Sequence, residues 1–253
     1  TGQEFRNENF YNVILGTDYY FDRYNVITLS GNFAYEIEDQ PSETQFAQFD
    51  GDGNLLAEWL RDETTSAQNP KYQYELQYKR DFRDNEDHTL LMSALGNFFG
   101  KSQSSFFTQT DIEGQSPVGD QQTRTAFQEA EFTFKLDYTK PFTDAITLET
   151  GSQYVINDVS NDFAVDNINN AECVNAPGYT NVFEYYQKVL ASSATMAKEG
   201  NRAGLKLGLR AENTDLRTFL VNTEQTNQQN FTNFFPSGHF SWKIGDAFSV
   251  QAV

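Results

Sequence analysis

A short run of oxygen-bearing side chains, Asp50, Asp52 and Asn54, alternates with single glycines. Calcium prefers such oxygen ligands arranged around a glycine turn, so these residues are the candidate metal ligands of the chain. The positions of the glycines and of the following Glu58 do not match an EF-hand loop. Further carboxylates follow at Asp62 and Glu63. We favour a turn-rich polar loop as the explanation, with calcium as the alternative hypothesis and no other cofactor expected.

The other residue types that support catalysis or metal binding are scarce. Cys173 is the single cysteine, so an internal disulfide and a cysteine-rich metal site are both excluded. His88 and His239 are the two histidines, and neither has an evident partner in the sequence. The chain contains no nucleophile elbow and no phosphate-binding loop. We therefore predict that the protein is not an enzyme.

Composition narrows the class of protein further. The chain has 253 residues with 18 Lys and Arg against 36 Asp and Glu, a net charge of -18. Nucleic-acid binding needs a basic surface, so a nucleic-acid partner is not expected. The 23 Phe and 13 Tyr exceed what a globular core needs, whereas aromatic girdles at membrane interfaces use them. No stretch reaches the roughly 20 apolar residues of a transmembrane helix.

Strict alternation of polar and apolar residues recurs along the chain. It is clearest in Lys71–Lys79, Glu131–Tyr138 and Ala203–Arg210. Successive side chains of a β-strand point to opposite faces, so each segment predicts a strand with one apolar and one polar side. We expect about ten strands, namely Tyr11–Phe21, Val26–Ile37, Lys71–Phe82, Thr89–Phe99, Ala126–Tyr138, Ile146–Ile156, Phe183–Ala197, Arg202–Leu216, Phe231–Ile244 and Phe248–Val253.

The connections between these strands alternate in length. The short ones are Asp22–Asn25, Arg83–His88, Lys140–Ala145, Lys198–Asn201 and Gly245–Ala247. The long polar ones are Glu38–Pro70, Gly100–Thr125, Asn157–Val182 and Arg217–Asn230. An up-and-down sheet collects alternate turns on opposite sides, as outer-membrane barrels do with short periplasmic turns and long extracellular loops. We predict an all-β, antiparallel, up-and-down transmembrane β-barrel.

Aromatic residues mark one end of this predicted sheet. Tyr19, Tyr20, Phe21 and Tyr24 cluster at a short turn. Rings with a polar tip suit the boundary between lipid headgroups and water, so the cluster predicts an aromatic girdle on the periplasmic side.

Two C-terminal segments carry a family resemblance. Gly208-Leu209-Arg210-Ala211-Glu212-Asn213-Thr214-Asp215 is followed by Asn233-Phe234-Phe235-Pro236-Ser237. This pairing resembles the barrel of TonB-dependent receptors of the Bacteroidetes type, in the outer-membrane β-barrel family. There, a strand of the first kind leads through a long loop to the second motif and another strand.

The resemblance implies a barrel of about 22 strands around an N-terminal plug. Residues 1–253 would form part of one such barrel domain without the plug, as a fragment of a longer protein in the outer membrane of a Gram-negative bacterium. It also implies uptake of a scarce nutrient, such as a siderophore, oligosaccharide, peptide or vitamin. The implied partners are outer-membrane lipid, the TonB energy-coupling complex acting through the plug, the nutrient, and a surface lipoprotein lid.

The side chains within the two motifs have simpler explanations than binding. Arg210 and Glu212 alternate with apolar neighbours and should face the lumen, where with Lys206 they are able to form a charge ladder against the plug or neighbouring strands. We favour a wet, polar lumen as the reason for them, because charged pairs between strands contribute only about 0.2–1 kcal/mol. Phe234, Phe235, Pro236 and Ser237 predict the start of a strand, since Pro lacks an N–H group and suits a strand start or edge.

Two other functions remain open on sequence grounds. A passive porin or structural barrel would share the strands and turns but lack energy coupling. A soluble β-sandwich acting as an adhesion or carbohydrate-binding module would cover the apolar faces with a second sheet.

Overall fold

Nearly all of the chain is extended. The computed structural model describes residues 2–116, 119–169, 172–245 and 248–252. The elements in these residues are β1 (Gly2–Glu4), β2 (Asn7–Asp22), β3 (Asn25–Phe49), β4 (Leu55–Asp81), β5 (Thr89–Glu113), β6 (Asp120–Thr143), β7 (Ile146–Asn169), β8 (Glu172–Asn175), β9 (Asn181–Glu199), β10 (Ala203–Leu220), η1 (Val221–Thr223), β11 (Gln225–Gly245) and β12 (Phe248–Ala252). None of these elements is a helix long and apolar enough to cross a membrane.

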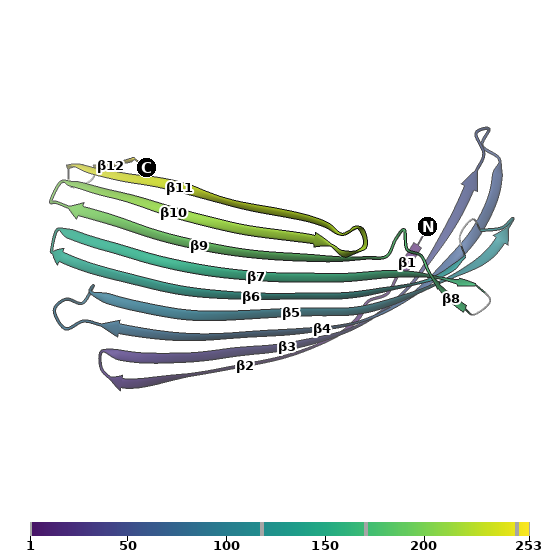
Figure 1. The fold of residues 1–253 in the computed structure, drawn as a ribbon, viewed down its shortest axis with the longest axis horizontal. Helices are drawn as coiled ribbons and strands as arrows, with labels where there is room; N and C mark the ends of the chain where they lie inside the picture. The colour runs from purple at the N-terminus through teal and green to yellow at the C-terminus, as the bar shows by residue number, and fades with distance from the viewer. Residues whose placement is uncertain (1, 117–118, 170–171, 246–247, 253) are drawn as a thin grey trace.

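The strands form one antiparallel sheet in sequence order (Figure 1). β1 and β2 both pair with β3 and together follow one edge, and β8 is a short addition to β7. The sheet runs from β3 through β4, β5, β6, β7, β9, β10 and β11 to β12. The up-and-down topology is therefore confirmed. The β-sandwich alternative is wrong, because all strands of the described residues belong to a single sheet.

Each of the ten predicted strands exists, but several are much longer than predicted. β3 and β4 have 25 and 27 residues, and only residues 50–54 separate them. The four long loops expected at Glu38–Pro70, Gly100–Thr125, Asn157–Val182 and Arg217–Asn230 are therefore wrong, because strands β3 to β11 occupy most of each. Outside a bilayer neither face of a strand needs to be apolar, so alternation fades while the backbone continues to pair.

The two kinds of connection lie at opposite ends of the sheet, as predicted. Figure 1 shows the tight turns between β2 and β3, β4 and β5, β6 and β7, and β9 and β10 at one end. The extended hairpins project at the other end. In the remaining short connection, residues 246–247 lie outside the described residues, as do Thr1 and Val253.

The sheet has an apolar outer face and a polar inner face. On β4 the outer face carries Tyr72, Tyr74 and Leu76, and the inner face carries Gln73 and Glu75 between them. The outer row continues across the sheet: Leu76 pairs with Leu29 of β3 and Ala94 of β5. Other outer-face residues include Phe33, Met92, Phe134, Leu190, Leu205, Leu207 and Leu209.

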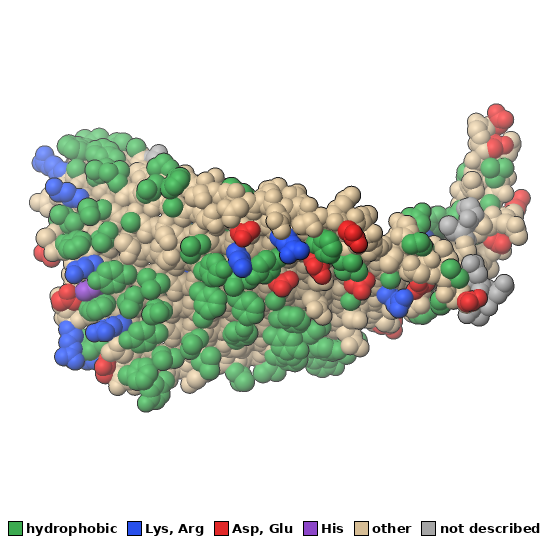
Figure 2. All heavy atoms as spheres, viewed as in Figure 1, with side chains coloured by type: hydrophobic (Ala, Val, Ile, Leu, Met, Phe, Trp, Pro, Cys, Tyr) green, Lys and Arg blue, Asp and Glu red, His purple; other side chains and the backbone are tan. Residues whose placement is uncertain are grey.

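Among the described residues, no second layer covers this apolar face. Leu76 is 48% exposed and Leu207 is 56% exposed. The buried apolar residues of the described chain are mostly alanines, namely Ala34, Ala57, Ala67, Ala176 and Ala191, with Trp59 and Val165. Figure 2 shows large hydrophobic patches over the broad part of the sheet. An apolar surface of this extent on a single sheet is what a lipid-facing wall requires.

Candidate functional site

The candidate calcium ligands lie at the tip of the β3–β4 hairpin and form a tight turn. The Asp50 carboxylate accepts hydrogen bonds from the backbone N–H groups of Asp52 at 2.9 Å and Asn54 at 2.8 Å. The Asn54 side-chain amide donates to its other oxygen at 2.9 Å. Gly53 has a φ of 86°, a left-handed conformation that glycine adopts without strain. The turn interpretation thus accounts for Asp50, Gly53 and Asn54.

The further carboxylates do not gather at this tip. Asp62 and Glu63 lie well inside β4, where they pair with Glu43 and Ser42 of β3. Glu58 accepts a hydrogen bond from the Gln45 side chain. The described residues contain no group of three or more His, Cys, Asp or Glu side chains placed to hold a metal ion. Calcium binding by Asp50, Asp52 and Asn54 stays a hypothesis for calorimetric titration.

The Asp50 turn should be sensitive to acid. Hydrogen bonds from the side chain and backbone of Asn54, and from the backbone of Asp52 and Gly53, hold the pKa of Asp50 below its usual value. The pKa of Asp50 is lower in the folded protein than in the unfolded chain. The ionised carboxylate therefore stabilises the turn at neutral pH, and this stabilisation is lost as the pH falls below about 3.9 toward the folded pKa. Hydrogen exchange at the tip should therefore accelerate in acid relative to Asp50→Asn, whose Oδ1 still accepts but does not titrate. Equal acid responses in the two proteins would contradict this role.

The two family motifs lie on neighbouring strands and pair directly. Leu209 of β10 is opposite Pro236 of β11, and Ala211 is opposite Phe234. The predicted strand start at Phe234, Phe235, Pro236 and Ser237 is wrong, because β11 already begins at Gln225. Pro236 is tolerated within the strand since β12 pairs only with residues 240–245 of β11 in the described chain. The strand edge beside Pro236 therefore needs no N–H donor there.

The charged residues of the first motif pair with their neighbours on the inner face. Arg210 Nη2 lies 2.9 Å from Glu212 Oε2 on the same strand. Lys206 Nζ reaches across β9 to Glu149 Oε2 of β7 at 2.7 Å. Gly208 lies between Lys206 and Arg210 on this face. Asn213 lies on the opposite, outer face with Leu209, where it donates hydrogen bonds to Asn230 and Thr232 of β11. The inner wall here is polar and its charges are locally balanced, in agreement with the wet-lumen interpretation.

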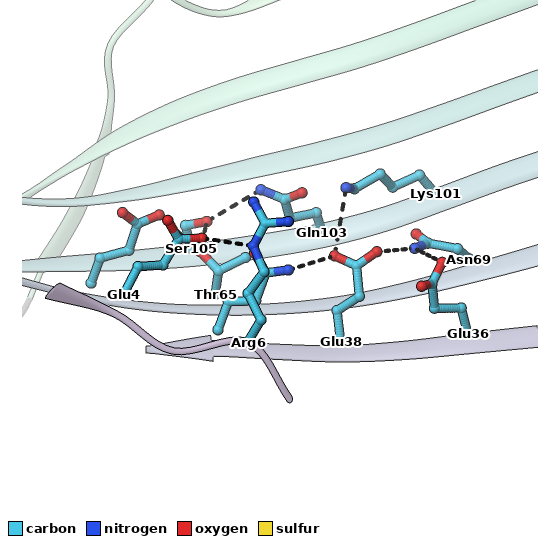
Figure 3. Close-up of polar contacts among 11 residues, drawn as sticks. Glu4, Arg6, Glu36, Glu38, Thr65, Asn69, Lys101, Gln103 and Ser105 are labelled. Carbon is cyan, nitrogen blue, oxygen red and sulfur yellow. Dashed lines mark hydrogen bonds and ion pairs between the residues drawn. The ribbon is translucent and has the colours of Figure 1, made fainter. Parts of the chain in front are cut away.

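A denser polar network occupies the inner face of β3, β4 and β5, beyond the apolar band (Figure 3). Asn69 donates hydrogen bonds to Glu36 at 3.1 Å and to Glu38. Lys101 Nζ lies 3.9 Å from Glu38 Oε2, and the Glu38 side chain is only 12% exposed. Because these acids are held by an amide and a lysine from two other strands, the wall has a defined arrangement of charge at this level.

The same network continues toward the hairpin tips through hydroxyl groups. The Thr65 and Ser105 hydroxyls lie 2.5 Å apart, and both residues are buried. Gln103 donates to Ser105 at 3.4 Å, and Thr65 donates to Glu63 at 2.9 Å (Figure 3). Sequence reasoning missed this network because its residues fell in segments assigned to loops. Polar residues stand at consecutive positions here, as in Thr64–Ser66 and Ser102–Ser105, so no alternation in the sequence marked the inner face.

His88 has partners that the sequence did not reveal. It lies in the β4–β5 turn and is 5% exposed. Its Nδ1 lies 2.7 Å from Asp84 Oδ1, and its Nε2 lies 3.0 Å from the Tyr138 hydroxyl. Its ring stacks on Phe82 with centroids 3.8 Å apart. The expectation that neither histidine has a partner is therefore wrong for His88, which ties the short turn to β6.

Comparison with protein-family models identifies the family of this chain. The model of the outer membrane protein beta-barrel family matches residues 80–253, well over half of the chain. The chain belongs to this family. The matched region begins in β4 and includes both motif strands. The protein is an outer-membrane β-barrel chain of a Gram-negative bacterium, and its apolar outer face is the surface that meets lipid.

A solved structure with a TM-score above 0.5 supports the fold. The ferric citrate transporter FecA, in its unliganded form, superposes with a TM-score of 0.52 at 9% identity, covering 97% of this chain and 40% of FecA. The ferric preacinetobactin receptor BauA from Acinetobacter baumannii gives a TM-score of 0.47 at 10% identity, covering 99% of this chain and 46% of BauA. The chain thus spans less than half the length of these proteins. Comparison with curated protein sequences gives no match.

Proposed function

We propose that this chain is part of the barrel wall of a TonB-dependent outer-membrane receptor of the Bacteroidetes type, which imports a scarce nutrient. The observation that carries the proposal is the superposition of nearly the whole sheet on 40% of the FecA transporter. A sheet that matches part of such a barrel, with its edges at β2 and β12 unpaired with each other in the described residues, fits a segment of a larger wall.

The two faces and two ends of the sheet support a receptor wall. The inner face presents the ordered network around Glu38 and the ion pairs of Lys206 and Arg210, a surface suited to water, a plug or a polar nutrient. The extended hairpins at the end opposite the short turns would supply the outer binding surface. The pairing of the Gly208–Asp215 and Phe234–Ser237 segments in adjacent strands supports the Bacteroidetes type.

The proposal includes partners beyond this chain. Energy would come from the TonB complex acting through a plug in the full-length protein. The nutrient would be a siderophore, oligosaccharide, peptide or vitamin, and a surface lipoprotein could close the outer side as a lid. We propose no catalytic step, because the wall can act by binding and passage alone.

Nutrient-limited growth tests the proposal. Deletion of the full-length gene should abolish growth on one limiting nutrient, and removal of TonB should abolish it to the same extent, because an energised plug cannot release substrate without TonB. A passive porin would pass the nutrient after TonB removal, so growth of that strain would overturn the proposal. Uptake of the labelled nutrient by intact cells provides the matching measurement.

A further inference from the structure

Cations gather at the short-turn end of the sheet, although the whole chain has a net charge of -18. We name five of them the turn-end cations: Arg23, Arg80, Arg83, Lys140 and Lys198. Figure 2 shows Lys and Arg side chains concentrated at this end. Among the described residues, none of the five has a carboxylate within 4.0 Å, whereas the inner-face Lys79 is paired with Asp81 at 3.0 Å. These cations are available to an external anion.

Strand pairing places three of the turn-end cations on the lipid-facing side. Arg80 pairs with Leu90, Lys140 with Leu148 and Lys198 with Leu205. Each therefore continues an outer-face row at the point where its strand reaches the turn. Exposed aromatic rings accompany them, including Tyr19, Phe21 and Phe142. Aromatic rings of this kind mark the headgroup depth of a bilayer.

Aromatic rings also contact the three arginines among the turn-end cations. The guanidinium groups of Arg23 and Arg83 lie 4.6 and 4.9 Å from the centre of the Tyr24 ring. Arg80 lies 4.8 Å from the Phe82 ring, which in turn stacks on the buried His88. A guanidinium stacked by its face keeps its N–H edge free for a planar or tetrahedral oxyanion. The three guanidinium groups thus have ring partners before any ligand binds.

Nearby carboxylates of the same turns are already engaged. Asp84 binds the His88 ring at 2.7 Å. Asp22 accepts hydrogen bonds from the Tyr24 backbone N–H at 2.7 Å and from the Asn25 side chain at 2.9 Å. These acids therefore stabilise the turns. Asp22 also attracts Arg83 at longer range, but the hydrogen bonds of Asp22 and Asp84 go to the turns and not to the stacked arginines.

We propose that the turn-end cations bind the phosphodiester headgroup of an anionic phospholipid in the periplasmic leaflet. Cations without an ion-pair partner continue the lipid-facing rows, and exposed aromatic rings lie beside them. Both are at the short-turn end of the sheet, which is the periplasmic end in outer-membrane barrels. A headgroup with net negative charge is favoured over a zwitterionic one, whose own ammonium group offsets the attraction. Basic pockets at membrane surfaces recognise anionic headgroups in this way.

Native mass spectrometry of the purified full-length protein tests this site. In neutral detergent, the protein should retain phosphatidylglycerol in preference to phosphatidylcholine of the same acyl chains. The variant with Arg80→Gln, Arg83→Gln and Lys140→Gln should lose that preference, by about fivefold for each cation removed. Raised salt should weaken the preference in the wild type, because exposed charges are screened.

A matched variant separates this site from general charge. Lys71→Gln, Lys101→Gln and Lys135→Gln remove the same number of cations from the inner face and should leave the preference unchanged. Arg80→Lys with Arg83→Lys keeps the charge and should retain most of it, which excludes misfolding as the cause of a loss. Equal retention of the two lipids by the wild type, or equal losses in the turn-end and inner-face variants, would overturn the proposal.

Discussion

Replacing Leu76 with arginine is expected to destabilise the folded protein by about 2–4 kcal/mol, the cost of a cation on the lipid face near the bilayer midplane. Leu76 lies in the outer-face row between Leu29 and Ala94, with Tyr74 and Tyr78 on either side along β4. It is 48% exposed in a sheet without a covering layer, so only lipid is available to surround it. Urea unfolding of the full-length protein in lipid vesicles measures the loss.

The adjacent position provides the control for Leu76. Gln77 is on the same strand but faces inward, where its side chain donates a hydrogen bond to Glu75 at 2.5 Å. Arginine at Gln77 meets water and a carboxylate, so Gln77→Arg should change stability by less than about 0.5 kcal/mol. If the two substitutions cost the same, the assignment of the outer face to lipid would fail at this strand.

The contrast between Leu76 and Gln77 depends on a part of the fold that can be predicted from the sequence alone. Within the bilayer, one face of each strand must be apolar, so Lys71–Lys79 alternates strictly and both its strand and its outward residues follow from the pattern. The antiparallel, up-and-down order of the strands also follows from the sequence. Turns as short as Asp22–Asn25 leave too few residues for a crossover between parallel strands. The all-β fold and the ends of the sheet were therefore predictable.

Sequence reasoning failed where the bilayer no longer constrains the chain. Residues 38–49 and 55–70 contain polar residues on both faces, and such composition resembles a loop although the backbone pairs along almost its whole length. Ring contacts such as the stack of Phe46 on Trp59, with centroids 5.4 Å apart, help hold the hairpin but depend on register. The register of a polar hairpin is fixed by its turn, which is here the Asp50 turn. The geometry of that turn could not be derived from the sequence.

Contacts between distant segments were the other failure. His88 and Tyr138 are 50 positions apart and meet because β5 pairs with β6. Glu38, Asn69 and Lys101 come from three successive strands in the same way. A single sequence gives the face on which each residue lies but gives no distance between strands. The candidate site could therefore be predicted as a polar inner face, and its individual contacts could not.

Substitutions at the two glycine neighbours of Tyr74, on the outer face, are also expected to change the stability of the protein strongly. Tyr74 of β4 is paired with Gly31 of β3 on one side and with Gly96 of β5 on the other. A Cβ at Gly96 would lie 2.6 Å from Cε2 of the Tyr74 ring, which covers this glycine. A Cβ at Gly31 would meet only the Gln73 carbonyl oxygen, at an ordinary 3.6 Å. The ring therefore needs glycine on one side only.

Alanine at these two glycines should have opposite effects on stability. Gly96→Ala pushes the Tyr74 ring out of its position across the strands and is expected to cost about 1–3 kcal/mol, as overpacking does. Gly31→Ala removes backbone freedom from the unfolded chain without a clash and should stabilise by about 0.4–1 kcal/mol. Tyr74→Ala should abolish most of the cost of Gly96→Ala, so that the double-mutant cycle shows a coupling well above 0.5 kcal/mol. An additive cycle would mean that the ring does not depend on Gly96, and that the smaller residue serves the β4–β5 pairing for another reason.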